Sequence, residues 1–131
     1  MLTSPPNQQL RILVVDDEPE TLTQVERALR LEGFEVTITA HAIGVSNLVR
    51  SFNPDVVLID VNIPELSGDR LLKLARKYAL PSTRFVLYSA CDESALRSLA
   101  QQSGADGYVT KSTDIVKLAE RLRAIVGKRG S

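Results

Sequence analysis

The chain has 131 residues, of which 44% are hydrophobic and 24% are charged, and its 16 basic residues balance its 16 acidic residues. This length leaves room for one domain with a hydrophobic core and excludes a second independent domain, while the composition excludes collagen-like, coiled-coil and disordered chains. A net charge of zero gives no overall attraction to the phosphate backbone of nucleic acid or to an anionic membrane, so we expect neither as a partner.

Cysteine usage and hydropathy indicate the compartment. Cys91 is the only cysteine, which excludes an internal disulfide and a cysteine metal cluster and favours a reducing compartment. The longest apolar runs, such as residues 56–59, are far shorter than the roughly 20 residues of a membrane-spanning helix. Residues 1–9 have neither the basic nor the apolar region of a signal peptide. We therefore expect a cytoplasmic protein.

Five short apolar runs predict strands, and longer amphipathic segments between them predict helices. Residues 11–15 and 55–59 are nearly continuous aliphatic runs, typical of central strands covered on both faces. Residues 34–38 alternate apolar with polar side chains, which indicates a half-exposed edge strand. The other two predicted strands are 84–88 and 107–110.

Helical spacing of apolar residues predicts the connecting segments. The first helix begins near Pro19 and stops at Gly33, and the third ends before Pro81. The fifth, over residues 115–126, has one wide apolar stripe. Residues 41–51 and 93–103 have weaker propensity or weaker packing and complete the set. Residues 10–126 thus form one doubly wound (βα)5 domain with a parallel five-stranded sheet, and residues 1–9 and 127–131 are flexible tails.

Polar residues gather where the predicted strands end. Asp16 and Asp17 follow the first strand, Asp60 the third, Ser89 the fourth and Lys111 the fifth. In a doubly wound sheet, ligands bind beyond the carboxyl ends of the strands. All five side chains therefore belong to the same rim of the domain.

The three carboxylates require a compensating charge. If the first and third strands are neighbours, each like-charged pair costs on the order of 4 kcal/mol at an effective dielectric near 20. Lys111 alone is insufficient, so either one carboxyl takes up a proton or a hard cation such as Mg²⁺ binds. A metal held this way also binds phosphoryl oxygens. Ser89 and Lys111 can then bind the other oxygens while Asp60 attacks phosphorus and becomes an aspartyl phosphate.

Four segments carry a resemblance to a known family. They are Val-Val-Asp-Asp-Glu at 14–18, Leu-Ile-Asp-Val-Asn-Ile-Pro-Glu-Leu-Ser-Gly at 58–68, Leu-Tyr-Ser-Ala at 87–90 and Gly-Ala-Asp-Gly-Tyr-Val-Thr-Lys at 104–111. In this order they resemble the receiver domain of two-component response regulators, in its stand-alone, chemotaxis-like form. The resemblance covers almost the entire chain and implies a flavodoxin-like fold with strand order 2-1-3-4-5.

The resemblance also implies roles for the acidic residues and their neighbour. Asp60 is then the phosphoacceptor, and Asp17 and Asp60 ligate Mg²⁺ directly. Asp16 acts largely through a metal-bound water, and the backbone carbonyl of Asn62 is a further ligand.

The remaining implied roles concern switching. Ser89 takes the place of the family's switch serine or threonine, Tyr108 that of its switch aromatic, and Lys111 that of its phosphate-binding lysine. One departure is Ser112, which stands where the family usually has proline, often after a cis peptide bond. For serine a cis bond costs roughly 2.5–4 kcal/mol. We therefore predict a trans or strained bond, with some displacement of Lys111 or of the start of the following helix.

Plain structural interpretations exist for these residues taken singly. Asp16 and Asp17 could cap the first helix, and Asp60 could be a turn residue. Tyr108 could be a half-buried strand aromatic with a solvated hydroxyl. The ordered combination of three acids, a hydroxyl and a lysine favours the functional interpretation.

We therefore expect a single-domain response regulator that accepts a phosphoryl group on Asp60 from a phosphohistidine on a histidine kinase or phosphotransfer protein, with Mg²⁺ as cofactor. It catalyses only its own phosphorylation and dephosphorylation, and signals to a protein target through the surface of the fourth helix, fifth strand and fifth helix. One alternative is a docking module that ignores phosphorylation. Another is an aspartyl-phosphate phosphohydrolase, although Asp60-Val-Asn62 lacks the second acid of such enzymes.

Overall fold

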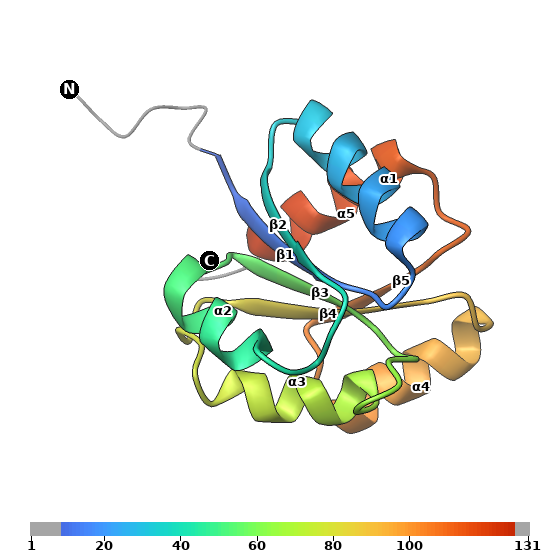
Figure 1. The fold of residues 1–131 in the computed structure, drawn as a ribbon. Coiled ribbons are helices and arrows are strands. Elements are labelled where there is room, and N and C mark those ends of the chain that lie inside the picture. Colours follow the sequence, from blue (N-terminus) through green and yellow to red (C-terminus); the bar gives the residue numbers. More distant parts are fainter. Residues whose placement is uncertain (1–8, 128–131) are drawn as a thin grey trace.

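The computed structural model describes residues 9–127, and a parallel five-stranded sheet lies at its centre (Figure 1). The strand order is β2-β1-β3-β4-β5. The strands are β1 (Arg11–Val15), β2 (Glu35–Thr39), β3 (Val56–Asp60), β4 (Arg84–Ser89) and β5 (Gly107–Thr110). This order confirms the predicted doubly wound, flavodoxin-like (βα)5 fold, with β2 as an edge strand.

Five helices cover the two faces of the sheet. They are α1 (Pro19–Leu31), α2 (Val45–Phe52), α3 (Gly68–Arg76), α4 (Glu93–Ser103) and α5 (Ile115–Gly127). In Figure 1, α1 and α5 lie on one side of the sheet, and α2, α3 and α4 lie on the other. Within residues 9–127, no helix combines the length and the apolarity that crossing a membrane requires.

The apolar core forms two layers because successive strand residues point to opposite faces. In β3, Val56 and Leu58 pack in the layer under α1 and α5, whereas Val57 and Ile59 pack in the layer under α2, α3 and α4. All four side chains are fully buried. This two-sided burial explains why β1 and β3 read as continuous apolar runs rather than as alternating ones.

Element boundaries differ from the predicted ones in a few places. Predicted helix 41–51 begins only at Val45, because Gly44 has a left-handed backbone (φ 93°), and it ends before Asn53, which is also left-handed (φ 51°). β2 and β3 each lie one residue later than predicted. α5 includes Gly127, the first residue of the predicted C-terminal tail. The rest of the predicted tails, 1–8 and 128–131, lies outside the described residues.

Candidate functional site

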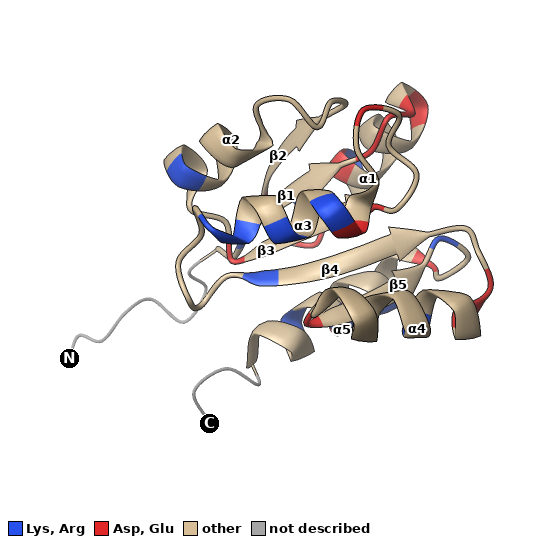
Figure 2. Cartoon of the chain, turned by 90° about the horizontal axis from the view of Figure 1, so that it is seen from below, with Lys and Arg blue, Asp and Glu red and all other residues tan. Residues whose placement is uncertain are grey.

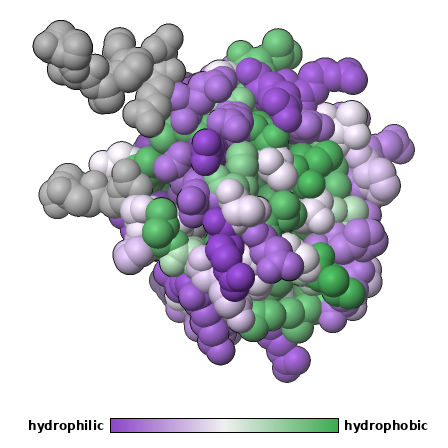
Figure 3. Space-filling view, turned by 60° about the vertical axis from the view of Figure 1, so that its left-hand side comes forward, coloured by the Kyte–Doolittle hydropathy of each residue, from purple (hydrophilic) through white to green (hydrophobic). Residues whose placement is uncertain are grey.

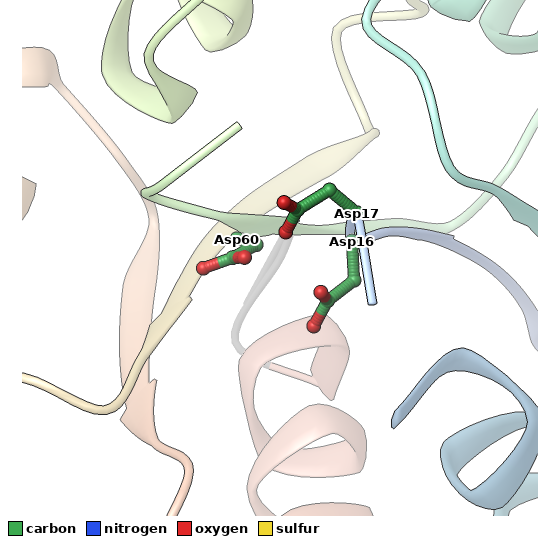
Figure 4. Close-up of side chains that lie close together, drawn as sticks. All are labelled: Asp16, Asp17 and Asp60. Carbon is green, nitrogen blue, oxygen red and sulfur yellow. The ribbon is translucent and has the colours of Figure 1, made fainter. Parts of the chain in front are cut away.

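Strand register brings the predicted acidic residues together at the carboxyl edge of the sheet. β1 pairs with β3 so that Val15 lies beside Ile59, and an aspartate follows each of these two residues. Asp16, Asp17 and Asp60 each offer one carboxylate oxygen, and these oxygens all lie within 4.8 Å of one another. Figure 4 shows the three side chains gathered at this point. The predicted convergence of the acids is therefore confirmed.

The three acids differ in their exposure. Asp16 is completely buried and Asp60 is 4% exposed, whereas Asp17 is half-buried. A cluster of carboxylate oxygens, one of them open to solvent, suits a hard divalent cation such as Mg²⁺, which keeps some of its waters. The donor set of this cluster therefore fits Mg²⁺.

Lys111 supplies the positive charge of the site. Its Nζ donates a 2.7 Å hydrogen bond to Oδ2 of Asp16 and forms a 3.5 Å ion pair with Oδ2 of Asp60. Burial works to lower the pKa of the Lys111 ammonium, but the hydrogen bond to Asp16 and the charges of both carboxylates outweigh it and raise that pKa. Lys111 thus remains protonated and faces two buried acids with one charge.

The charge imbalance is visible at Asp60. Burial raises the pKa of the Asp60 carboxyl from 3.8 to about 6, and the negative charge of Asp16 adds to this effect. The hydrogen bond from the backbone N–H of Asn62 (3.2 Å) and the charge of Lys111 act in the opposite direction without cancelling it. The ionised form of Asp60 is therefore under-compensated by the protein alone.

The loop after Asp60 depends on Gly68, whose importance the sequence pattern indicated only as part of a motif. The N–H of Gly68 donates to the carbonyl oxygen of Val61 (2.9 Å). A Cβ at position 68 would overlap the carbonyl oxygen of Asp60 and lie 2.9 Å from Cα of Val61. Only glycine allows the start of α3 to approach the phosphoacceptor candidate this closely.

The alternative role of the first two acids as helix caps is not observed. The N-cap residue of α1 is Glu18, and no side-chain cap hydrogen bond is present. Asp16 instead accepts a 3.0 Å hydrogen bond from the N–H of Glu18. This contact orients Asp16 towards Lys111 rather than towards the interior of α1.

Ser89 and Asn62 lie at the ends of neighbouring strands. Ser89 is the last residue of β4 and is completely buried, and its Oγ accepts a 3.2 Å hydrogen bond from the N–H of Cys91. Asn62 follows β3, and its side chain is exposed. Its contact with the acids is made by the backbone N–H described above.

Tyr108 lies apart from the acidic cluster and contacts α4 and α5. Its hydroxyl accepts a 2.9 Å hydrogen bond from Nε of Arg97 and donates to Glu93 (3.3 Å). Arg121 lies over its ring at 5.7 Å and donates to its carbonyl oxygen (2.8 Å). The side chain is half-buried, as its plain interpretation predicted, but its hydroxyl has protein partners. No sequence pattern indicated that Glu93 and Arg97 would hold this hydroxyl, or that Arg121 would lie over the ring.

The turn at Ser112 contains a trans peptide bond, since no cis bond occurs in residues 9–127. The hydroxyl of Thr110 contacts the hydroxyls of Ser112 (3.0 Å) and Thr113 (3.2 Å), and the N–H of Lys111 donates to the carbonyl oxygen of Ser89 (2.8 Å). The prediction of a trans bond is confirmed. The ammonium of Lys111 reaches both acids, and a displacement of Lys111 or of the start of α5 stays a prediction.

The strand order and the helix arrangement define a flavodoxin-like domain, and an acidic cluster with a lysine lies at the carboxyl edge of its sheet. The family described as "Response regulator receiver domain" matches residues 12–123. The chain therefore belongs to the receiver domain family of two-component response regulators.

Solved structures and curated relatives agree with this assignment. A CheY-like receiver domain from Methanospirillum hungatei superposes with a TM-score of 0.82, 26% identity and coverage of 92% of this chain and 96% of that one. The signal receiver domain of the putative response regulator NarL from Mycobacterium tuberculosis superposes with a TM-score of 0.81 and 30% identity, and the match covers 93% of this chain and 99% of that one.

Among curated proteins, "Probable transcriptional regulatory protein TcrX" of Mycobacterium tuberculosis is 37% identical over 124 residues, which are 94% of this chain and 52% of that protein. PrrA of the same organism is 32% identical over 123 residues, which are 92% of this chain and 52% of that protein. The chain thus spans about half the length of the curated relatives it matches. Since these are named as transcriptional regulators, the stand-alone form and the absence of nucleic-acid contact both stay predictions.

Proposed function

We propose that this protein accepts a phosphoryl group on Asp60 from a phosphohistidine donor, in a Mg²⁺-dependent reaction. The observation that carries the proposal is the meeting of three carboxylates and one ammonium at the carboxyl edge of the sheet. The donor is a histidine kinase or a histidine phosphotransfer protein, as the resemblance to receiver domains implies. The protein acts only on its own phosphorylation state and turns over no second substrate.

Four residues would hold the metal. Asp17 and Asp60 would bind Mg²⁺ directly, Asp16 largely through a water, and Asn62 through its backbone carbonyl. When bound, Mg²⁺ neutralises charge on the carboxylates and on the incoming phosphoryl oxygens. The half-buried position of Asp17 leaves the cluster open to the solvent that Mg²⁺ retains in its shell.

The transfer forms one bond and breaks one. A carboxylate oxygen of Asp60 attacks phosphorus, the P–N bond of the donor breaks, and the imidazole leaves with the bonding electron pair. Lys111, which already lies 3.5 Å from Asp60, binds an oxygen of the transferred group as charge accumulates. The Ser89 hydroxyl, at the end of the neighbouring strand, binds another.

The response would pass to the face formed by α4, β5 and α5. Tyr108 on this face is held by Arg97 and Glu93, whose side chains are 54% and 62% exposed. Exposed contacts of this kind contribute at most about 1 kcal/mol each. A rearrangement that follows the movement of Ser89 towards a phosphoryl group can therefore break the contacts of Tyr108. A hollow of about 210 Å³ lies beside Tyr108 and Arg121, and a target protein bound there would sense a change in the position of Tyr108. We propose a cytoplasmic location for this signalling.

The test is phosphorylation by a small phosphodonor such as acetyl phosphate, followed by intact-mass spectrometry. The expected result is one added phosphoryl group in Mg²⁺ and none in excess EDTA. The Asp60→Asn variant should remain unphosphorylated. The matched Asp69→Asn variant, changed on α3 outside the cluster, should be phosphorylated like the wild-type chain. Full modification of Asp60→Asn, or equal modification in EDTA, would refute the assignment.

A second measurement separates signalling from constitutive docking. A partner that reads phosphorylation binds the phosphorylated chain and its Asp60→Asn variant with different affinities. A partner of a constitutive docking module binds both equally. Binding of a purified partner to each form, measured in the same buffer, therefore decides between these two functions.

A further inference from the structure

A groove between α2 and α3 lies outside the acidic site and outside the face of α4, β5 and α5. It has a volume of about 320 Å³ and is bordered by the loop before α2, by α2 itself, and by the loop and first turns of α3. Its large apolar lining residues are Ile43, Leu66, Leu71 and Leu74. None of the acids in the cluster and no residue of α4 or α5 contributes to it.

Two of these apolar side chains contribute little to the core. Ile43 is 81% exposed and Leu74 is 44% exposed, whereas Leu71 beneath them is 1% exposed. Figure 3, which turns the α2 side of the molecule forward, shows exposed apolar side chains between polar ones. A concave site with a buried apolar floor and exposed apolar edges is suited to receive aliphatic side chains of another molecule.

The two helices that border the groove carry an excess of basic residues. Helices α2 and α3 together carry four basic residues and one acid, Asp69, and Figure 2 shows this basic excess along α3. Within residues 9–127, no ion pair to a carboxylate is formed by Arg70, Lys73 or the adjacent Lys77. By contrast, α1 carries two acids and two bases. Because the chain as a whole is neutral, this imbalance is a local property of the two helices beside the groove.

The geometry of α3 connects the two features. Arg70 and Lys77 lie four residues before and three residues after Leu74, so both share its side of the helix. Lys73 is the preceding neighbour of Leu74 and is exposed. Glu65, the acid at the groove, is already engaged by His41 (3.2 Å) and by the N–H of Ala42 (3.3 Å). The unpaired charge around the apolar floor is therefore basic.

We infer that the α2–α3 groove docks an acidic amphipathic helix of a partner protein. Leucine-type side chains of that helix occupy the space between Ile43 and Leu74, and its flanking carboxylates pair with Arg70, Lys73 and Lys77. Helix-in-groove recognition uses aliphatic anchors, and complementary charge adds specificity to it. The inference depends on neither metal binding nor phosphorylation.

The test uses a synthetic peptide probe of about 14 residues with leucines at helical spacing and glutamates on both flanks. Amide chemical-shift changes in the isotope-labelled protein should cluster in residues 42–50 and 65–77. Isothermal titration calorimetry should show about tenfold or greater weakening by Ile43→Asp, because a buried apolar contact is replaced by a like charge. The matched control Leu31→Asp, at an equally exposed position of α1 (83%), should leave the affinity unchanged.

Charge variants test the second half of the inference. Lys73→Glu should weaken binding several-fold, whereas Arg27→Glu, at an exposed position of α1, should not. A probe with lysine in place of every glutamate should fail to bind. Far-ultraviolet circular dichroism of each variant confirms that the fold is retained, and all four substitutions are at exposed positions.

Three outcomes would overturn the inference. The first is equal binding of the acidic and basic probes, and the second is chemical-shift changes confined to α4, β5 and α5. The third is a protein that does not bind the peptide but sediments with anionic vesicles, provided that Ile43→Asp abolishes the sedimentation. Repeating the titration with Asp60→Asn should give an unchanged affinity. A failure here therefore leaves the proposed phosphoacceptor function untouched, and the reverse also holds.

Discussion

Replacing Asp60 by asparagine should stabilise the metal-free protein at neutral pH. Asparagine has the shape of the protonated carboxyl and carries no charge, so it removes the unfavourable ionisation of a side chain that is 4% exposed. The pKa of Asp60 rises from 3.8 to about 6 in the folded state, mainly through burial. The folded protein therefore holds a proton on Asp60 more tightly than the unfolded chain does.

The size of the effect follows from this shift. The raised pKa of Asp60 means that its protonation stabilises the folded state. This contribution is fully present below about pH 4 and is lost as pH rises through about 6, and the total loss is about 3 kcal/mol at 1.36 kcal/mol per pKa unit. Asp60→Asn should recover an amount of this order at about pH 7.5, about half of it near pH 5, and little below pH 4. Lys111 keeps its 2.7 Å hydrogen bond to Asp16 in the variant.

The measurement is urea unfolding followed by circular dichroism in EDTA at several pH values. Glu120→Gln, which also removes a carboxylate but at an exposed position of α5, should change the unfolding free energy by no more than about 0.5 kcal/mol. Two results would contradict this reasoning. They are an Asp60→Asn variant that is no more stable than the wild-type chain at neutral pH, and a difference in unfolding free energy that grows as pH falls.

Three further changes test other parts of the site and core. Lys111→Met should cost about 3 kcal/mol or more at neutral pH, because it leaves Asp16 buried without its cationic partner; urea unfolding should show the loss shrinking when Mg²⁺ is added. Gly68→Ala should cost about 1–3 kcal/mol and weaken Mg²⁺ binding in calorimetry, since its Cβ overlaps the backbone of Asp60; unchanged affinity would contradict the close approach of α3. Leu58→Ala should cost about 2–5 kcal/mol with Mg²⁺ affinity retained, because Leu58 is fully buried in the apolar core and contributes no oxygen to the acidic cluster.

The fold could be predicted because its sheet imposes a strong pattern on the sequence. β1 and β3 are buried on both faces, and only continuous aliphatic runs satisfy that environment. The boundary of α2 was harder to place, because a left-handed Gly44 decides where the helix begins and glycine is compatible with many backbone conformations. Local pattern thus determined the type of each element better than its ends.

The convergence of the acids was predictable for a topological reason. Parallel strands deliver their carboxyl ends to one edge, so adjacent β1 and β3 necessarily place Asp16 near Asp60. The partners of Tyr108 were not predictable in this way. Glu93 and Arg97 form an i,i+4 pair on an exposed helix face, a common surface arrangement, and only the packing of α4 beside β5 brings Tyr108 between them.

The same imbalance that destabilises the site also makes it responsive. One ammonium, Lys111, faces two buried carboxylates and a third, half-buried one. A cation bound at this cluster would relieve the repulsion among the acids, and that relief would add to its binding free energy. A fully compensated site, with a second lysine for example, would be more stable and would bind Mg²⁺ more weakly. Because Asp60 contributes most to the strain and is the proposed acceptor, relief of that strain and the chemistry occur at the same carboxylate, and Mg²⁺ affinity should fall as pH drops through about 6.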